Sequence, residues 1–376
     1  MTVRDIIAAL DRWAPEAQAA DFDRVGLQVG DPSREVTRVI VALDLTPEVV
    51  DEAVETGAEM IVTHHPLLFK PLAWLTPTDF VSALAFRLAE AGIAYAAIHT
   101  NLDALRGGVS FGLAALLGLH NVTTLAPERG MLNKLVVFAP RTHAEAVRQS
   151  IARAGGGQIG DYRDCSFSAP GTGRFRATEG TDPHVGAQGE VHAEPEERIE
   201  ALVERWALGR VVRAMEAAHP YEEVAYDVYA VENAHRTVGY GALGTLAEPM
   251  PLQDFLAHTA ARLGAEAIRY SASPDATVSR VAVCGGSGMT FFGAALRSGA
   301  DAYVTADVTY HRFFDPMDTE GHARIALIDA GHYETEWISE RLIADRLAGE
   351  FSGLAVSRTR HRTSPMQTFV PTRGTA

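Results

Sequence analysis

Apolar residues recur along the chain either at helical spacing or in short runs typical of buried strands. The spacing of Ile6, Ile7, Leu10 and Trp13 predicts a helix over Val3 to Trp13. The run Met60 to Thr63 predicts a short strand that ends before Pro66. Further helices, each after a strand, are predicted over 47–56, 78–91 and 107–117. This order predicts an α/β fold.

The predicted strand-helix-strand unit occurs twice. Residues 36–41 are echoed by 278–283, and residues 56–63 are echoed in part by 298–305, both at an offset of 242 residues. Two matches in one register indicate a duplicated unit, so His64 and His65 have Ala306 and Asp307 as counterparts. A third strand is predicted before His99 and another before His332. Polar side chains should therefore gather where parallel strands end, which is where open α/β sheets bind ligands.

The pattern changes from about Met131 onward. A strand is predicted over 134–138, a helix over 142–154, glycine-rich hairpins up to Glu194, a helical stretch over 195–218 and a strand over 224–231. Strand, helix, two strands, helix and strand is the ferredoxin-like order. We therefore expect an inserted ferredoxin-like α+β domain at 131–238, within a discontinuous α/β core of residues 1–130 and 239–376 with mixed or parallel sheets. The tail after Ser352 is expected to form an edge strand and a loosely held end.

Composition narrows the class of protein. The chain has 376 residues, 47% of them hydrophobic, which is enough for a large core. Its formal charge of −15 argues against a broad nucleic-acid surface. The sequence has no apolar run long enough to span a membrane and no signal-peptide pattern at its start, so a cytoplasmic protein is expected. Cys165 and Cys284 are too few and too distant for a disulfide framework.

Candidate metal ligands lie at three places. His64 and His65 end a strand, although a single buried histidine is often a core residue. Asp103 follows His99 by four residues and could bridge two cations, or be a cap or turn aspartate. His332 and Glu336 lie one helical turn apart, a spacing that also occurs in surface pairs.

Together these five side chains favour a pair of metal ions. Imidazole nitrogens with carboxylate oxygens suit zinc, manganese, iron, cobalt or nickel better than magnesium or calcium, and zinc is the first expectation. Three imidazoles and two carboxylates are more ligands than one tetrahedral zinc needs. Two divalent ions per chain would use all of them.

Three motifs carry a family resemblance: Thr63 to Pro66, His99 to Asp103, and Gly331 to Glu336. Together with Gly26 to Gly30, they resemble the Nif-three-like family, whose members are named GTP cyclohydrolase I type 2 homologues. The resemblance covers nearly the whole chain. It implies a dinuclear centre, a toroidal homohexamer, and a middle insertion similar to the PII and CutA proteins that includes His219 to Glu223. It also implies the metal ligands His64, His65, Asp103, His332 and Glu336.

The chain departs from the family pattern at two places. Phe22-Asp23-Arg24 stands where members usually have Trp-Asp-Asn, and we interpret this stretch as a plain connection rather than a catalytic element. Thr309 stands where a lysine is frequent. Asp307, Tyr310 and His311 remain candidates for lining a substrate, because the repeat places them opposite the histidine pair. The amides of Gly286 and Gly288 could hold a phosphate, and a tight packed turn is the equal alternative.

The leading hypothesis is a metal-dependent hydrolase similar to GTP cyclohydrolases. Metal-activated water would attack a nucleotide-like or phosphorylated small molecule, while Glu336 or His99 moves protons. The alternative is a metal-dependent binding, chaperone or regulatory protein without turnover. Apart from other copies of the chain, neither the sequence nor the resemblance identifies a partner.

Overall fold

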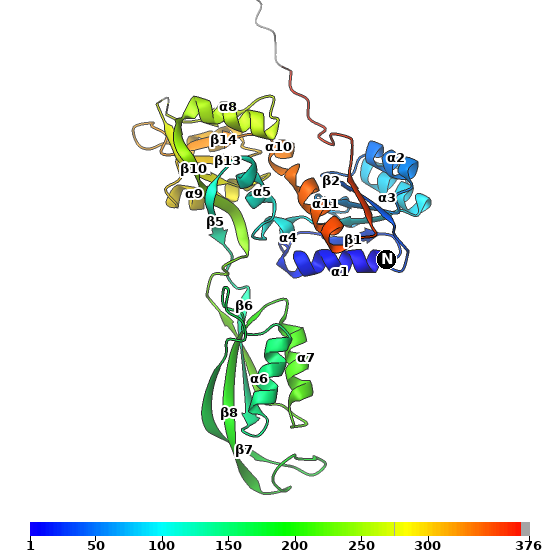
Figure 1. Cartoon of the computed structure of the whole chain (residues 1–376), viewed down its shortest axis with the longest axis vertical. Coiled ribbons are helices and arrows are strands. Elements are labelled where there is room, and N and C mark those ends of the chain that lie inside the picture. Colours follow the sequence, from blue (N-terminus) through cyan, green and yellow to red (C-terminus); the bar gives the residue numbers. More distant parts are fainter. Residues whose placement is uncertain (274, 370–376) are drawn as a thin grey trace, which may run out of the picture. The chain divides into compact units, whose positions relative to one another are not determined.

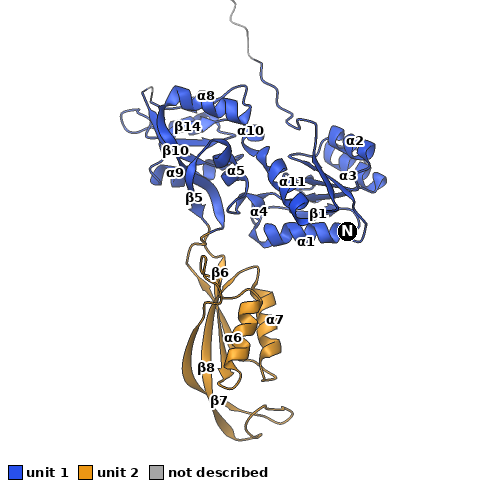
Figure 2. Ribbon diagram, in the orientation of Figure 1, with its two compact units in different colours: residues 1–127, 237–376 blue, residues 128–236 orange. Residues whose placement is uncertain are grey.

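The computed structural model describes residues 1–273 and 275–369, which form two compact units (Figure 2). Unit 1 combines residues 1–127 with the chain from 237 onward, and unit 2 comprises residues 128–236. Pro127 and Gly239 are register partners in neighbouring strands of unit 1. The chain therefore leaves unit 1 and returns to it at adjacent points. No helix in this described part of the chain has the length and apolar character of a membrane span.

The first sheet of unit 1 has the strand order β1-β4-β3-β2-β15. Four of its strands run parallel, and β1 is antiparallel to β4. The strands are β1 (Gly26–Val29), β2 (Arg38–Ala42), β3 (Met60–Thr63), β4 (Ala94–Ala97) and β15 (Ala355–Arg358). The predicted strand over Met60 to Thr63 is confirmed, and so is the edge strand in the C-terminal tail.

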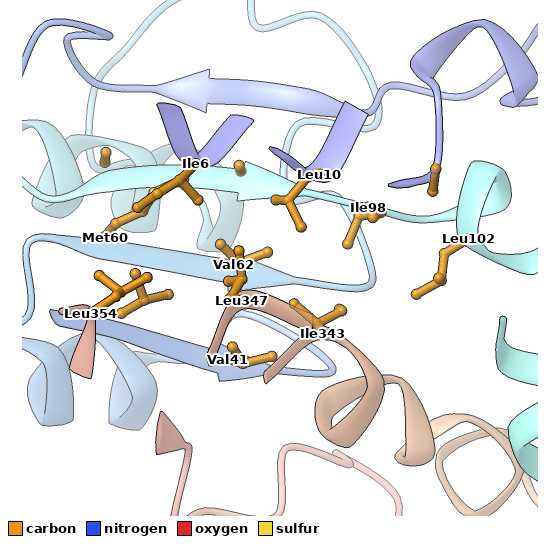
Figure 3. Packing of buried hydrophobic residues seen from close by; sticks show 14 of the residues in the cluster. Ile6, Leu10, Val41, Met60, Val62, Ile98, Leu102, Ile343, Leu347 and Leu354 are labelled. Carbon is orange, nitrogen blue, oxygen red and sulfur yellow. The ribbon is translucent and has the colours of Figure 1, made fainter. Parts of the chain in front are cut away.

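Helices cover both faces of the first sheet, because its strands are apolar on both sides. Helix α1 (Val3–Trp13) and helix α11 (Ile338–Glu350) pack on one face, where Ile6, Val62 and Leu347 share a fully buried cluster (Figure 3). Helices α2 (Pro47–Thr56) and α3 (Phe80–Ala91) pack on the other face. Helix α2 begins with a proline at its first turn and ends at Gly57, whose φ of 67° is left-handed. These local signals explain why α2 has its predicted bounds.

The second sheet has the order β11-β14-β13-β12-β10-β5. Its central strands β12, β13 and β14 are parallel, and the flanking strands are antiparallel. The strands are β5 (His120–Pro127), β10 (Gly239–Pro251), β11 (Arg269–Ser271), β12 (Thr277–Val283), β13 (Ala302–Thr305) and β14 (Ala326–Asp329). Helices α5 (Val109–Leu116) and α8 (Leu252–Leu263) cover one face, and α9 (Phe292–Arg297) covers the other (Figure 1).

The two sheets repeat one arrangement. In each, three parallel strands follow one another and an antiparallel strand, β1 or β11, pairs with the third. Strand β13 begins and ends 242 residues after β3, as the repeat in the sequence predicts. The predicted duplication is thus present in a mixed α/β fold. Four short elements follow strand ends: α4 (Thr100–Asp103), η2 (Gly288–Phe291), η3 (Tyr310–Phe314) and α10 (His332–Glu336). The short element η1 (Glu16–Gln18) instead follows α1.

Unit 2 is a four-stranded antiparallel sheet with two helices on one face. Its sheet order is β7-β8-β6-β9, and residues of α6 and α7 pack with Leu135, Val137 and Ile199. The elements are β6 (Leu132–Pro140), α6 (Ala144–Arg153), β7 (Phe167–Arg176), β8 (Val191–Glu204), α7 (Leu208–Ala218) and β9 (Tyr226–Val231).

The helical stretch predicted over 195–218 is wrong in its first part. Residues up to Glu204 belong to strand β8, and the helix begins only at Leu208. Ile199, Ala201 and Val203 alternate with more exposed residues, which is the period of a strand buried on one side. Glutamates such as Glu196 and Glu200 have good helix propensity, but the hydrogen bonds of this segment with β6 and β7 stabilise it as a strand.

Candidate metal centre

Polar side chains from both sheets of unit 1 meet at the carboxyl ends of parallel strands. His64 and His65 follow β3, and their backbone amides donate to the carbonyls of Ala42 and Leu43 at the end of β2. The carbonyl of His65 accepts hydrogen bonds from Thr63 and Tyr95. The histidine pair is therefore fixed by its backbone, as expected for the end of a buried strand.

The second sheet contributes His332 and Glu336 from α10, which begins three residues after β14. They lie one turn apart on one side of the helix, and the Glu336 Oε2 is 2.9 Å from the Nε2 atoms of both His332 and His65. Glu336 is thus the carboxylate where ligands from the two sheets meet.

Four imidazoles share one mode of support. Each has an oxygen acceptor at Nδ1, so Nδ1 donates a proton to that oxygen and Nε2 faces the centre. The Nδ1 partners are the Ile98 carbonyl for His64 (2.8 Å), Asp44 for His65 (2.7 Å), Asp23 for His99 (2.9 Å) and Asp307 for His332 (2.7 Å). Histidines that bind metals in proteins almost always have such a partner on the other nitrogen.

The Nε2 of His64 is unusual for a buried atom. The side chain is fully buried, and Nε2 has no hydrogen-bond partner among the described residues. The nearest carboxylate oxygen is Asp103 Oδ1, at 3.4 Å. A buried polar atom without a partner costs about 1–3 kcal/mol, so this geometry favours a ligand that the nitrogen would bind.

Three overlapping groups of side chains could hold a metal ion. Within each group the candidate ligand atoms all lie within 4.8 Å of one another. The groups are His64 with His65 and His99, His65 with His332 and Glu336, and His64 with Asp103 and Glu336. These donors therefore fit a transition metal.

The carboxylates strongly affect the titration of the histidines. Burial alone lowers the pKa of His65, but hydrogen bonds to Asp44 and Glu336 outweigh it and raise the pKa to about 10. Burial also opposes the charged form of His332, whose bonds to Glu336 and Asp307 raise its pKa to about 9. Burial raises the pKa of Glu336, but its histidine partners lower it further, to well below its usual value.

All five predicted ligands, and also His99, lie together in these groups. The predicted substrate-lining residues are distributed differently. Asp307 supports His332, with a left-handed backbone (φ 54°) that an aspartate tolerates. Tyr310 is 73% exposed on η3, where its ring contacts His311 and Phe314.

The glycine turn after β12 is a tightly packed one. The amide of Gly286 donates to Thr335 and that of Gly288 donates to Thr305, so both donors are already used within the protein. Of the two alternatives considered for this turn, the geometry favours the packed one. Gly286 has a close neighbour in the site, because a Cβ there would lie 2.2 Å from Glu336 Oε1.

Asp44, Asp23 and Thr363 are site residues that the sequence prediction missed. Asp44 follows β2 as His65 follows β3, so the rule about strand ends could have found it. Asp23 accepts hydrogen bonds from His99 and Thr100. The stretch around Asp23, which the sequence predicts to be a plain connection, therefore takes a direct part in the site. Thr363 donates to Asp44 from the C-terminal tail (2.9 Å) and has no detectable signal in the sequence.

A family model described as Duf34/NIF3 (NGG1p interacting factor 3) matches residues 1–365. The chain belongs to the Duf34/NIF3 family. Relatives named GTP cyclohydrolase 1 type 2 homolog include one from Halalkalibacterium halodurans, 38% identical over 343 residues and covering 91% of each chain. Another, from Mycobacterium tuberculosis, is 40% identical over 344 residues, covering 90% of this chain and 89% of its own.

Solved structures of Duf34/NIF3 relatives have the same fold. A Bacillus cereus protein related to NIF3 superposes with a TM-score of 0.82 at 36% identity, covering 98% of this chain and 99% of that one. The Staphylococcus aureus protein SA1388 gives 0.78 at 28% identity with the same coverage. The mixed α/β fold predicted from the sequence is therefore shared by this family.

Proposed function

We propose that the protein is a metal-dependent hydrolase with a dinuclear centre held by His64, His65, Asp103, His332 and Glu336. The observation that carries the proposal is the direction of the imidazoles. Four Nδ1 atoms are bound from behind by oxygen acceptors, and the buried Nε2 of His64 has no partner among the described residues. Most buried polar atoms in proteins have a partner, so an unpaired imidazole nitrogen beside two carboxylates favours a bound ligand.

Two ions are proposed because the donors form two groups that share Glu336. One group contains His64 and Asp103, and the other contains His65 and His332. Two divalent ions held by these groups would repel each other, and the negative charge of the shared Glu336 would offset part of that repulsion. Zinc is the leading candidate, with manganese, iron, cobalt or nickel compatible with the same donors.

A bound divalent metal supplies a Lewis acid that can lower the pKa of water to about 7. The protein's own part is to position groups and move protons. His99 is held by Asp23 through Nδ1 (2.9 Å), so its Nε2 can take a proton next to His64 and His65. Glu336, the carboxylate shared by two of the candidate groups, is the proposed second group that moves protons.

The proposed substrate is a nucleotide-like or phosphorylated small molecule. This class follows from the printed name of the relatives, GTP cyclohydrolase 1 type 2 homolog, rather than from a built phosphate site. Tyr310 and His311 on the exposed element η3 are proposed to contact it, together with Asp307 and Gly286 beside the centre. Gly288 is kept only as a structural support.

The test is a turnover screen on metal-reconstituted protein, with GTP as the first substrate. Metal-dependent product formation that is lost in Asp103→Ala would support the hydrolase. Saturable binding of GTP without any product would instead favour the alternative, a metal-dependent binding or regulatory protein.

We also propose a homohexamer in the cytoplasm. A loop between β3 and α3 exposes apolar side chains, with Trp74 65% exposed and Phe69 in ring contact with Phe22. Exposed apolar surface of this kind is typical of subunit contacts. Both cysteines are free thiols, which suits a reducing compartment. Light scattering on the intact chain tests the assembly: a monomer at micromolar concentration would contradict it.

Unit 2 is proposed to be an inserted ferredoxin-like domain. Its element order β6-α6-β7-β8-α7-β9 and sheet order β7-β8-β6-β9 support this assignment.

A further inference from the structure

Unit 2 contains a cavity of about 650 Å³ that the proposed hydrolase does not use. It lies on the side of the sheet away from α6 and α7. Leu135, Val137 and Ile199 face those helices, so Phe138 and Glu196, at odd-numbered offsets from them along the same strands, face the other way. The volume is in the range of small-molecule sites, roughly 300–1,000 Å³.

Aromatic rings and glycines shape this cavity. Phe138, Phe175 and Tyr221 line it, and the rings of Phe175 and Tyr221 are 6.0 Å apart. Gly171, the cross-strand partner of Glu196, would have no atom within 4 Å of an added Cβ. A flat group could therefore lie over the strand here against aromatic faces.

Glu196 provides an unusual polar group in this apolar setting. Its side chain is buried, with 7% of the residue exposed, although glutamate is rarely buried without an ionic partner. Among the described residues its carboxylate accepts one side-chain hydrogen bond, from the Tyr221 hydroxyl to Oε1 (3.0 Å), and forms no ion pair. Oε2 lies over Gly173, where a Cβ would approach it to 2.2 Å.

The motif from His219 to Glu223 fixes this arrangement. His219 donates from Nε2 to the Phe138 carbonyl (3.0 Å), and its Nδ1 accepts from the amide of Tyr221 (3.1 Å). Both nitrogens are used, so the turn is held and the tyrosine hydroxyl points to Glu196. The cation nearest along β8, Arg198, is engaged with Glu200. The carboxylate therefore keeps acceptor capacity toward the cavity, because an ionised carboxylate has about four acceptor positions.

We propose that this cavity binds a small molecule carrying an amidine-type edge, two neighbouring N–H donors on a flat conjugated group, which pairs with the Glu196 carboxylate. Carboxylates recognise such forked donors through paired, charge-assisted hydrogen bonds. The rings of Phe175 and Tyr221 favour the flat cationic group, whereas the Phe138 ring already has the Arg198 guanidinium 5.8 Å from its centroid.

The experiment is calorimetric titration of the metal-loaded full chain with benzamidine, and with benzoate as its charge-reversed analogue. We expect benzamidine to bind at one site per chain with a Kd below about 1 mM, and benzoate not to bind. Glu196→Gln should weaken benzamidine binding by about tenfold or more. Glu216→Gln, which removes an exposed carboxylate from α7 on the helical face, is the matched control and should bind as the wild type does.

Ala169→Phe fills the cavity while leaving every charge in place, and it should abolish binding. This variant decides the question if circular dichroism shows that Glu196→Gln does not fold. Absence of saturable benzamidine binding to the wild type would overturn the proposal. So would benzoate binding as tightly as benzamidine, or unchanged affinity in the folded cavity variants.

Discussion

The buried Nε2 of His64 lies 3.4 Å from Asp103 Oδ1 and has no hydrogen bond to any described residue. Its other ring nitrogen is engaged with the Ile98 carbonyl, so the ring cannot turn to satisfy Nε2 elsewhere. The pair therefore defines one side of the proposed centre, and Glu336 connects it to His65 and His332.

Glu336 should matter more for metal content than any single histidine. It is the residue shared by the group with His65 and His332 and the group with His64 and Asp103, the two groups that contain a carboxylate. Glu336→Ala should lower occupancy at both positions, while Asp103→Ala should affect mainly the His64 side and His65→Ala mainly the other. Native mass spectrometry gives the counts, with the exposed Asp345→Asn as control. Two ions retained in Glu336→Ala would contradict the shared role.

Metal binding at pH 7.5 should release about two protons per chain. In the metal-free protein, the pKa values of His65 (about 10) and His332 (about 9) are raised above that pH, so both rings are charged. Each must lose a proton to donate a lone pair. Zinc titrations in buffers of different ionisation enthalpy measure the release, which should disappear above both pKa values. A heat of binding that is independent of buffer at pH 7.5 would rule this out.

Asp44→Asn should weaken metal binding although Asp44 is not a proposed ligand. It holds His65 at Nδ1, and loss of such a support typically costs about 10–100-fold in affinity. Thr363→Val, which removes only the bond to Asp44, should have a smaller effect in the same direction. Competition with a fluorescent chelator measures both. Equal affinity in Asp44→Asn and the Asp345→Asn control would show that this support is dispensable.

Glu340→Gln should change how stability depends on pH. Burial raises the pKa of Glu340 to about 7, against a backbone hydrogen bond from Leu43 that lowers it. The folded state thus binds a proton that the unfolded state has released, and stability falls as pH rises from the unfolded pKa through about 7.

The amide introduced by Glu340→Gln stays neutral at every pH. The free energy of unfolding of the metal-free wild type should therefore fall by about 2 kcal/mol relative to that of the metal-free variant between pH 5 and pH 8. Urea unfolding at both pH values provides the comparison. A constant difference between the two proteins would mean that this carboxyl titrates normally.

Replacing residues 128–236 by a short Gly/Ser linker should leave unit 1 folded and able to bind metal. Pro127 and Gly239 already face each other in the β5–β10 pair, so the linker closes an ordinary hairpin. Solubility and metal count should match those of the full chain. Loss of both would show that unit 2 is needed for the core.

The sequence predicts the parts of this protein that depend on local pattern. Pro47 and Gly57 mark the ends of α2, and the histidine pair is found because a proline closes a short strand. The prediction of a helix over 195–204 was wrong because the glutamates in this stretch favour a helix. The alternation of apolar and polar residues there is that of a strand, and pairing with β6 and β7 makes the strand the more stable structure. Thr363 could not be predicted, since its contact with Asp44 spans 319 residues.

Strand β15 and the tail after it affect the order in which unit 1 can fold during synthesis. β15 is the last strand in the described part of the chain and pairs with β2, one of the first, and Thr363 then completes the support of Asp44. During synthesis the ribosome therefore releases β2 to β4 long before their neighbour exists. The nascent chain must keep the β2 edge unpaired, and the support of Asp44 is complete only after Thr363 has emerged.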